Sequence, residues 1–394
     1  MDYAKYFVET PKKQSQPLCD QWLLRVTLVI IAMGVIMVAS ASISIAQEKM
    51  NDAFYFTQRH LLFLGIGLIM SLIVLKVPVI RWYRLSPLTL LITFILLVFV
   101  FVPGIGQSKP INGSLRWIPI GSYNLQVSEL AKLFVMSYLA GYLVRHAEDA
   151  RSSLSGFIRP LTVVFIICAM LVAQPDFGTA VVIMISAMIL MFLGGVRSSS
   201  FLIVSLAMLA LFVVLVYAVN YRLERFTSFR DPWAHSTNTG YQLVNSFMAF
   251  GLGGFSGVGI GAGLQKTGYL PEPHTDFLYA VIGEELGLIG TTLVILLFVV
   301  LVTRSFAIGQ RALVARLNFH GYFAYGIGIW IGLQAFINMG VNLGLLPTTG
   351  LTLPLMSYGG SSLITTMMAI AILLRIDYET RTKPHSLRPR FRQA

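Results

Sequence analysis

A short polar segment in the second half of the chain carries groups suited to acid–base chemistry. Residues 269–276 contain Glu272, His274 and Asp276 together with two prolines that stiffen the segment. A long apolar run follows directly. A carboxylate beside a histidine could act as a general base, which typically contributes about 10²–10⁴ in rate. The alternative is an ordinary helix N-cap, since Asp or Thr often precedes a helix. The residues alone leave both interpretations open.

Glu129 and Lys132 are charged residues at the start of another apolar run. Their i, i+3 spacing puts both on one face of a helix, where they can pair. One interpretation is a salt bridge that makes membrane insertion tolerable, because each charge costs about 2.5–3.5 kcal/mol on insertion scales. The other is a polar cavity wall that holds an anionic group. Both can hold at once.

Three further carboxylates stand at the ends of apolar runs. Asp176 follows Gln174-Pro175 and is placed to cap the next helix, with Thr179 in its first turn. Glu284 and Glu285 are adjacent, so they point about 100° apart on a helix and we expect at most one to face any single site.

Two segments rich in small residues complete the candidate chemistry. Residues 251–263 contain many glycines but lack the context of a nucleotide-binding loop. They predict a backbone that approaches a ligand or another helix closely. Residues 346–362 mix Pro, Gly and hydroxyl groups, which predicts a pocket wall because such segments at membrane depth are tolerated only inside protein or beside water. We therefore expect Ser357 and Ser361 to contact substrate.

The elements that must position these groups are transmembrane helices. Hydrophobic residues make up 56% of the chain and charged residues 12%, about half the charge of a soluble domain. A helix needs about 20 apolar residues to cross a bilayer. This predicts an all-α protein with ten spans, near 22–46, 58–76, 84–103, 128–146, 158–174, 177–195, 199–221, 278–303, 319–345 and 357–377. The break at 174–176 is interpreted as a tight turn between two spans.

The distribution of Lys and Arg predicts that both termini are cytoplasmic. We expect a polar N-terminal tail over 1–21, a membrane domain over 22–377 and a basic tail over 378–394. A large extracytoplasmic loop would span 222–277. The first apolar run follows about twenty mostly polar residues and is predicted to be retained as a span. The net charge of +12 does not indicate nucleic-acid binding, because the basic residues lie between apolar runs and form no basic domain.

Six ordered motifs resemble the SEDS family, the shape, elongation, division and sporulation proteins of bacteria, over nearly the whole chain. The motifs are Asn112-Gly-Ser-Leu-Arg-Trp-Ile118, Ser128-Glu-Leu-Ala-Lys132, Gln174-Pro-Asp-Phe-Gly-Thr179, Leu270-Pro-Glu-Pro-His-Thr-Asp-Phe277, Gly283-Glu-Glu-Leu-Gly287 and Pro354-Leu-Met-Ser-Tyr-Gly-Gly-Ser-Ser362. Within the family, the sequence is more similar to the division members than to the elongation members. The family has ten spans with both termini inside.

The resemblance implies a peptidoglycan glycosyltransferase of the bacterial inner membrane, working at the division septum. Its substrate would be lipid II, a disaccharide-pentapeptide on undecaprenyl diphosphate, and its product a β-1,4-linked glycan strand. The family's essential aspartate falls on Asp276, and its acidic–basic pair falls on Glu129 and Lys132. The implied partners are a class B penicillin-binding transpeptidase and other division membrane proteins.

We expect Asp276 to take a proton from the acceptor hydroxyl. A cation would stabilise the leaving diphosphate, either a basic side chain or a divalent ion such as Mg or Mn. The candidate side chains are Arg116, Lys132 and Lys266, and His274 is expected to contact substrate. Two other functions fit parts of the pattern: a flippase that transports lipid II, and a non-catalytic scaffold for division proteins.

Overall fold

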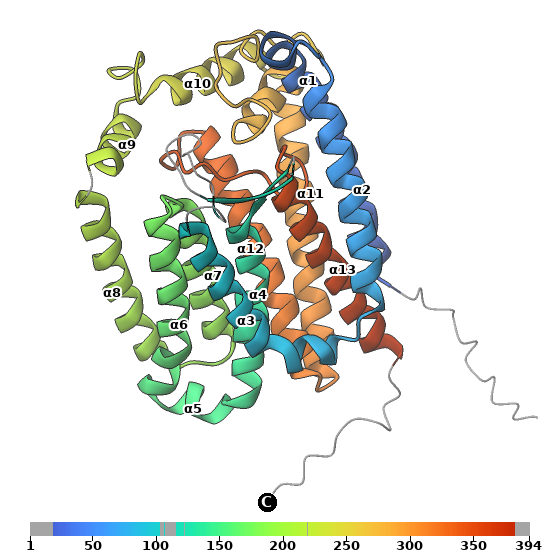
Figure 1. The fold of residues 1–394 in the computed structure, drawn as a ribbon, viewed down its shortest axis with the longest axis vertical. Helices are drawn as coiled ribbons and strands as arrows, with labels where there is room; N and C mark the ends of the chain where they lie inside the picture. The colour runs from blue at the N-terminus through green and yellow to red at the C-terminus, as the bar shows by residue number, and fades with distance from the viewer. Residues whose placement is uncertain (1–18, 103–105, 107–115, 122, 219, 383–394) are drawn as a thin grey trace, which may run out of the picture.

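The protein is a bundle of helices, as the sequence predicts (Figure 1). The computed structural model describes residues 19–102, 106, 116–121, 123–218 and 220–382. Its elements are α1 (Gln21–Met50), α2 (Tyr55–Lys76), α3 (Val79–Phe101), β1 (Trp117–Ile120), β2 (Tyr123–Gln126), α4 (Val127–Arg145), α5 (Ala147–Ser152), α6 (Leu154–Ala173), α7 (Phe177–Leu193), α8 (Ser198–Tyr217), α9 (Asn220–Arg230), α10 (Tyr241–Gly253), α11 (Leu278–Val314), α12 (Asn318–Asn342) and α13 (Gly360–Thr382).

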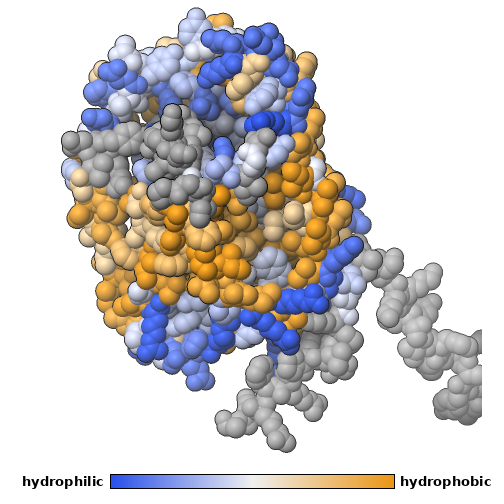
Figure 2. Space-filling view, in the orientation of Figure 1, coloured by the Kyte–Doolittle hydropathy of each residue, from blue (hydrophilic) through white to orange (hydrophobic). Residues whose placement is uncertain are grey.

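The spans follow the apolar runs of the sequence. Within the described residues, nine helices are long and apolar enough to cross a membrane. The remaining expected span, 177–195, corresponds to α7, an apolar helix of 17 residues. The break at 174–176 is a turn between α6 and α7, which confirms that prediction. Figure 2 shows an apolar band across the middle of the face in view, with hydrophilic surfaces at both ends.

The helices divide into a protected centre and a lipid-facing periphery. Most of α4, α12 and α13 is buried inside the protein, whereas α2, α3 and α8 are largely exposed. A helix at the centre can carry polar groups only where other helices satisfy them. The central helices are therefore the ones that can build a polar site.

The long loop expected at 222–277 contains two helices, α9 and α10, at the end of the bundle called here the loop face (Figure 1). The shorter loop before α4 contains an antiparallel hairpin of β1 and β2, which the sequence did not indicate. The α13 helix continues to Thr382, five residues beyond the expected end of the last span.

A break in α11 brings the glycine-rich segment into the fold. Gly287 has a left-handed backbone, with φ of +63°, and divides the helix into two parts. Residues 254–259 supply partners for the backbone groups freed at this break. The four N–H···O bonds run from Val258 to Glu284, Gly259 to Glu285, Leu288 to Gly254 and Ile289 to Phe255.

This close approach requires glycine. A Cβ on Gly257 would lie 2.1 Å from the carbonyl oxygen of Glu285. The predicted close approach of the 251–263 backbone to another helix is therefore confirmed, and its partner is α11.

Candidate active site at the loop face

Asp276 lies at the loop face, two residues before α11. The structural N-cap of α11 is Phe277, and no side chain caps it there. The interpretation of Asp276 or Thr275 as the N-cap is therefore wrong: the Thr275 hydroxyl instead bonds to Glu272. Within the described part of the chain, no hydrogen bond or ion pair engages the Asp276 carboxylate, and the residue as a whole is half-buried.

An asparagine from α12 does the capping. The side-chain oxygen of Asn342 accepts from the N–H of Ala280 at 3.1 Å, and its Nδ2 donates to the Asp276 carbonyl at 3.0 Å. Asn338, one turn earlier, also donates to that carbonyl, at 2.9 Å. The backbone of Asp276 is thus held by α12, while its carboxylate has no hydrogen-bond partner among the described residues.

The carboxylate lies beside the segment between α12 and α13. A Cβ on Gly350 would lie 3.6 Å from Oδ2 of Asp276 and, among the described residues beyond its chain neighbours, would meet no other atom within 4 Å. Gly350 has a φ of +71°, which glycine adopts without strain. The neighbouring carbonyls of Leu351 and Thr352 are held by Asn338 and Gln334. This segment therefore forms one fixed wall of the site, as its composition predicted.

The environment makes Asp276 a weaker acid than usual. Burial, followed by the negative charge of Glu272, raises the pKa of Asp276 to about 6. Asp176 acts in the same direction, while the positive charges of Arg116 and Arg225 oppose the rise in pKa. A pKa near the working pH suits a general base.

Arg116 links the loop between α3 and α4 to the turn between α6 and α7. Its guanidinium donates to the carbonyl of Pro175 and lies 3.8 Å from the Asp176 carboxylate. Asp176 also accepts from the N–H of Thr179 and caps α7, which confirms its predicted role. Asn112 and the three residues after it, from the same motif, lie outside the described residues.

His274 is buried among aromatic rings. Its ring lies 4.5 Å from that of Phe56 and 5.4 Å from that of Tyr358, measured between centroids. Its carbonyl accepts from the N–H of Tyr358 at 2.9 Å. Burial lowers the pKa of His274 to about 4, so the ring is neutral at pH 7. In this structure His274 anchors the segment, and its expected contact with substrate stays a prediction.

Glu129 and Lys132 form the ion pair that their spacing predicted, at 2.8 Å. The ammonium also donates to Oε1 of Gln334 at 2.6 Å and lies 5.4 Å from the centroid of Trp330. Gln334 reaches from this pair to the carbonyl of Thr352. The pair therefore supports the wall of the site through α12, and its binding of an anionic group stays a prediction.

Lys266 and the two glutamates of α11 fasten the glycine-rich segment. The Lys266 ammonium pairs with Glu285, and the hydroxyl of Ser40 lies 2.7 Å from each of these side chains. Glu284 accepts from the N–H groups of Leu264 and Gln265. Lys266 and both glutamates are buried.

Both glutamates face the same segment, contrary to the expectation that at most one would. The reason is that residues 254–266 wrap around α11 just before its break at Gly287 and contact it on both sides.

The two serines expected to contact substrate bond to backbone instead. The Ser357 hydroxyl accepts from the N–H of Leu353, and that of Ser361 accepts from the N–H of Gln126 at the start of α4. Both hold the wall segment in place, and a direct contact with substrate stays a prediction.

Two sets of residues at the site were not predicted from the sequence. Gln334, Asn338 and Asn342 stand at i, i+4 and i+8 in an apolar span, and that amide stripe was the available signal for a polar face. Arg225 lies on α9, and its Nη1 donates to the carbonyl of Thr348 at 3.1 Å.

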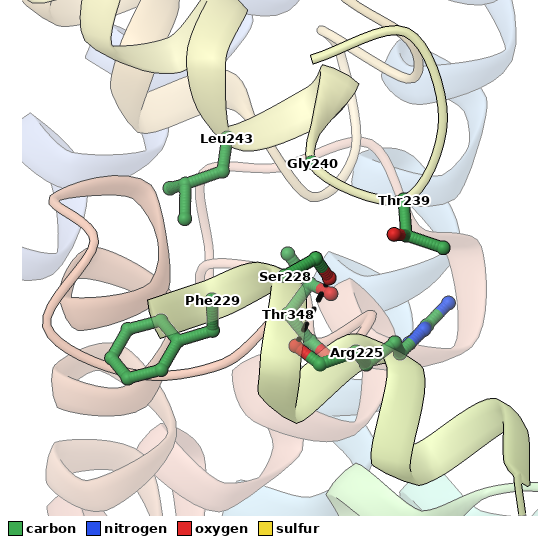
Figure 3. A pocket seen from close by; sticks show the side chains of 7 residues that line it. All are labelled: Arg225, Ser228, Phe229, Thr239, Gly240, Leu243 and Thr348. Atoms are coloured by element: carbon green, nitrogen blue, oxygen red, sulfur yellow. Dashed lines mark hydrogen bonds between the residues drawn. The ribbon is translucent and has the colours of Figure 1, made fainter. Parts of the chain in front are cut away.

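A small pocket lies beside Arg225, between α9, α10 and Thr348 (Figure 3). Its volume of about 10 Å³ is close to what one water molecule needs. The pocket is therefore too small for a sugar. Among the described residues, no group of three or more His, Cys, Asp or Glu could hold a metal ion.

Comparison with protein families gives a match over most of the chain. Residues 20–382 match the family model FTSW_RODA_SPOVE, described as cell cycle protein. A probable peptidoglycan glycosyltransferase FtsW of Methylomonas methanica is 46% identical over 360 residues, covering 91% of this chain and 92% of the relative. One of the same name from Allochromatium vinosum is 47% identical over 379 residues, covering 96% and 94%.

Solved structures share the fold. One chain, from a study of how a peptidoglycan synthase complex coordinates polymerization and crosslinking, has a TM-score of 0.76 and 28% identity, covering 93% of this chain and 99% of that one. The rod shape determining protein RodA of Thermus thermophilus has a TM-score of 0.67 and 26% identity, covering 93% and 98%.

Proposed function

This chain belongs to the FtsW/RodA/SpoVE family of cell cycle proteins, and we propose that Asp276 is the general base with which it polymerises lipid II. It is a multi-pass membrane protein and a peptidoglycan glycosyltransferase that makes β-1,4-linked glycan strands for the cell wall. The observation that carries the assignment of the base is that, among the described residues, the Asp276 carboxylate has no hydrogen bond or ion pair, while Asn342 caps the helix.

In the proposed reaction, Asp276 takes the proton from the acceptor's sugar hydroxyl as its oxygen attacks the anomeric carbon of the donor. The bond from that carbon to the diphosphate breaks, and the lipid diphosphate leaves with the electron pair. A single displacement of this kind inverts the anomeric centre. With a pKa of about 6, Asp276 is roughly 90% ionised at pH 7 and ready to accept a proton.

The leaving diphosphate needs positive charge near Asp276. Lys132 and Lys266 are already paired with buried carboxylates. Arg116 is the candidate from the sequence whose charge acts on Asp276. Among the described residues, no group of three or more His, Cys, Asp or Glu could hold a resident metal, and a requirement for Mg or Mn stays a prediction.

The setting of the reaction is proposed from the sequence and from the relatives. The loop face would be extracytoplasmic and both termini cytoplasmic in the bacterial inner membrane, following the distribution of basic residues. Division-type relatives support a place at the septum. The similarity to a chain from a peptidoglycan synthase complex supports a class B penicillin-binding transpeptidase as the partner.

The test is polymerisation of purified lipid II in detergent by the full-length protein with its cognate transpeptidase. Asp276→Asn preserves shape but removes the base, so we expect no polymer from it, while unfolding and membrane insertion match the wild type. Asp231→Asn changes an exposed aspartate of the same loop region and should retain activity. Normal polymer yield from Asp276→Asn would disprove the assignment.

The polymerisation assay tests the flippase alternative, and a cell-division assay of the same variant tests the scaffold alternative. A flippase has nothing to transport in detergent, so polymer made there excludes transport as the only activity. A scaffold would support division equally well with Asn at position 276, so loss of division by that variant would exclude it.

A further inference from the structure

Arg225 connects the large loop to the wall of the site. It lies on α9 and donates a hydrogen bond to the carbonyl of Thr348. Thr348 is two residues before Gly350 in the wall segment. A Cβ on Gly350 would lie 3.6 Å from Oδ2 of Asp276, so this part of the wall is next to the proposed base. Figure 3 shows Arg225 of α9 and Thr348 lining the same small pocket. A residue distant in sequence thus reaches the wall beside the proposed base.

The proposed reaction places strict demands on this region. The anomeric carbon lies between the attacking hydroxyl, held by Asp276, and the leaving diphosphate. The diphosphate must therefore lie within a few ångströms of the base, beside the carboxylates of Glu272 and Asp176, which act on Asp276 electrostatically. Two anionic groups at this separation repel each other unless cations stand between or beside them.

A guanidinium has the geometry to meet this demand. It carries five N–H donors in a planar fork, so it can hold a carbonyl and a phosphate oxygen at once. Arg116 uses its guanidinium on the Pro175 carbonyl and lies 3.8 Å from Asp176. Arg225 donates to a neutral carbonyl at 3.1 Å, and its positive charge acts on Asp276 together with that of Arg116.

We propose that Arg225 is a substrate-binding residue that, with Arg116, holds the diphosphate of the donor lipid beside Asp276. This inference rests on the proposed function and adds a role for α9. The loop helix supplies a cation to the site, and the Thr348 carbonyl holds its guanidinium at the wall segment.

The test uses undecaprenyl diphosphate, a lipid diphosphate without sugar, binding to the full-length protein in detergent. Charge-assisted hydrogen bonds contribute about 1.5–3 kcal/mol, so we expect Arg225→Ala to weaken binding by about tenfold to 150-fold. Arg225→Lys keeps a charge without the fork and should fall in between. Arg230→Ala removes an exposed charge from the same helix and should bind as the wild type does.

Unchanged binding by Arg225→Ala would overturn the proposal, whatever happens to polymer yield. Because the probe has no sugar, its binding does not depend on glycosyl transfer. If Asp276 proves not to be the general base, the binding of undecaprenyl diphosphate can still be measured and still tests the role of Arg225.

A second readout separates binding from a merely structural role of Arg225. Among the described residues, the charged groups that act on Asp276 are Glu272, Asp176, Arg116 and Arg225. Removing one positive charge should raise the pKa of Asp276, so the acidic limb of the pH–rate profile should move to higher pH in Arg225→Ala. Arg225→Lys should leave the limb close to its wild-type position. An unmoved limb in Arg225→Ala would show that its charge does not reach the site.

Discussion

The buried ion pair between Lys266 and Glu285 offers a sharp test of how the glycine-rich segment is held. Both side chains are at most 5% exposed, and Ser40 of α1 bonds to each of them. We consider Lys266→Met, Glu285→Met and the double variant, since methionine approximates the length of both side chains. The first variant removes the positive charge, the second removes the negative charge, and the double variant removes both.

The structure sets different magnitudes for these variants. Each single change leaves an uncompensated buried charge, which typically costs about 3–5 kcal/mol in the free energy of unfolding. The double change removes both charges and leaves only the Ser40 hydroxyl short of partners, at a cost of about 1–3 kcal/mol. The double variant should therefore be more stable than either single variant.

The assay is unfolding of the full-length protein in detergent, followed by the fluorescence of its five tryptophans. Lys49→Met, at an exposed position, is the matched control and should change stability by less than about 0.5 kcal/mol. Single variants as stable as this control, or a double variant as unstable as the sum of the singles, would refute the reasoning.

The same double variant bears on a role of Lys266 in catalysis. If Lys266 only fastens the segment, the folded double variant should polymerise lipid II at close to the wild-type rate. If Lys266 binds the diphosphate, the double variant should be stable and inactive.

Two further predictions concern the proposed base. Glu272→Gln removes the negative charge that raises the pKa of Asp276, so the pKa should fall below about 6 and the acidic limb of the pH–rate profile should move to lower pH. A limb that stays in place or moves upward between pH 4.5 and 8 would contradict this electrostatic account. Asn342→Leu leaves the carbonyl of Asp276 and the N–H of Ala280 each with one bond fewer, which should lower the turnover number more than it raises KM. An unchanged turnover number would show that the α12 contact does not position the base.

Much of the bundle could be predicted from the sequence because bilayer thickness fixes the length of an apolar helix. The Glu129–Lys132 pair was also predictable, since both partners lie on one helical turn. So was the capping of α7 by Asp176, which involves residues three apart. These features depend on local spacing, which a single sequence contains.

The contacts that complete the site connect residues far apart in sequence. Asn342 and Asp276 are 66 residues apart, and Ser40 and Glu285 are 245 apart. The sequence shows that these side chains are polar, but the choice of partner depends on how the helices pack. The alternative interpretation of Asp276 as an N-cap was wrong for this reason: a side chain from another helix caps α11 in its place.

The position of Asp276 follows from the way a membrane protein provides hydrogen-bond partners for backbone groups where a helix begins or breaks. Polar groups freed at a helix end near lipid must find partners inside the protein. At the start of α11 those partners come from Asn338 and Asn342 of α12, and at the Gly287 break they come from residues 254–259. Residues 276–287 are therefore held from both sides by groups outside the segment itself.

This arrangement makes the geometry of the base a property of the packing between α11, α12 and the large loop. A misplacement of 1 Å in a reacting group can reduce a rate by about 10²-fold. A shift of α12 that is too small to break the Asn342 bonds would still carry the Asp276 backbone with it. Changes at the α11–α12 contact, far from any substrate atom, should therefore alter turnover before they alter substrate binding.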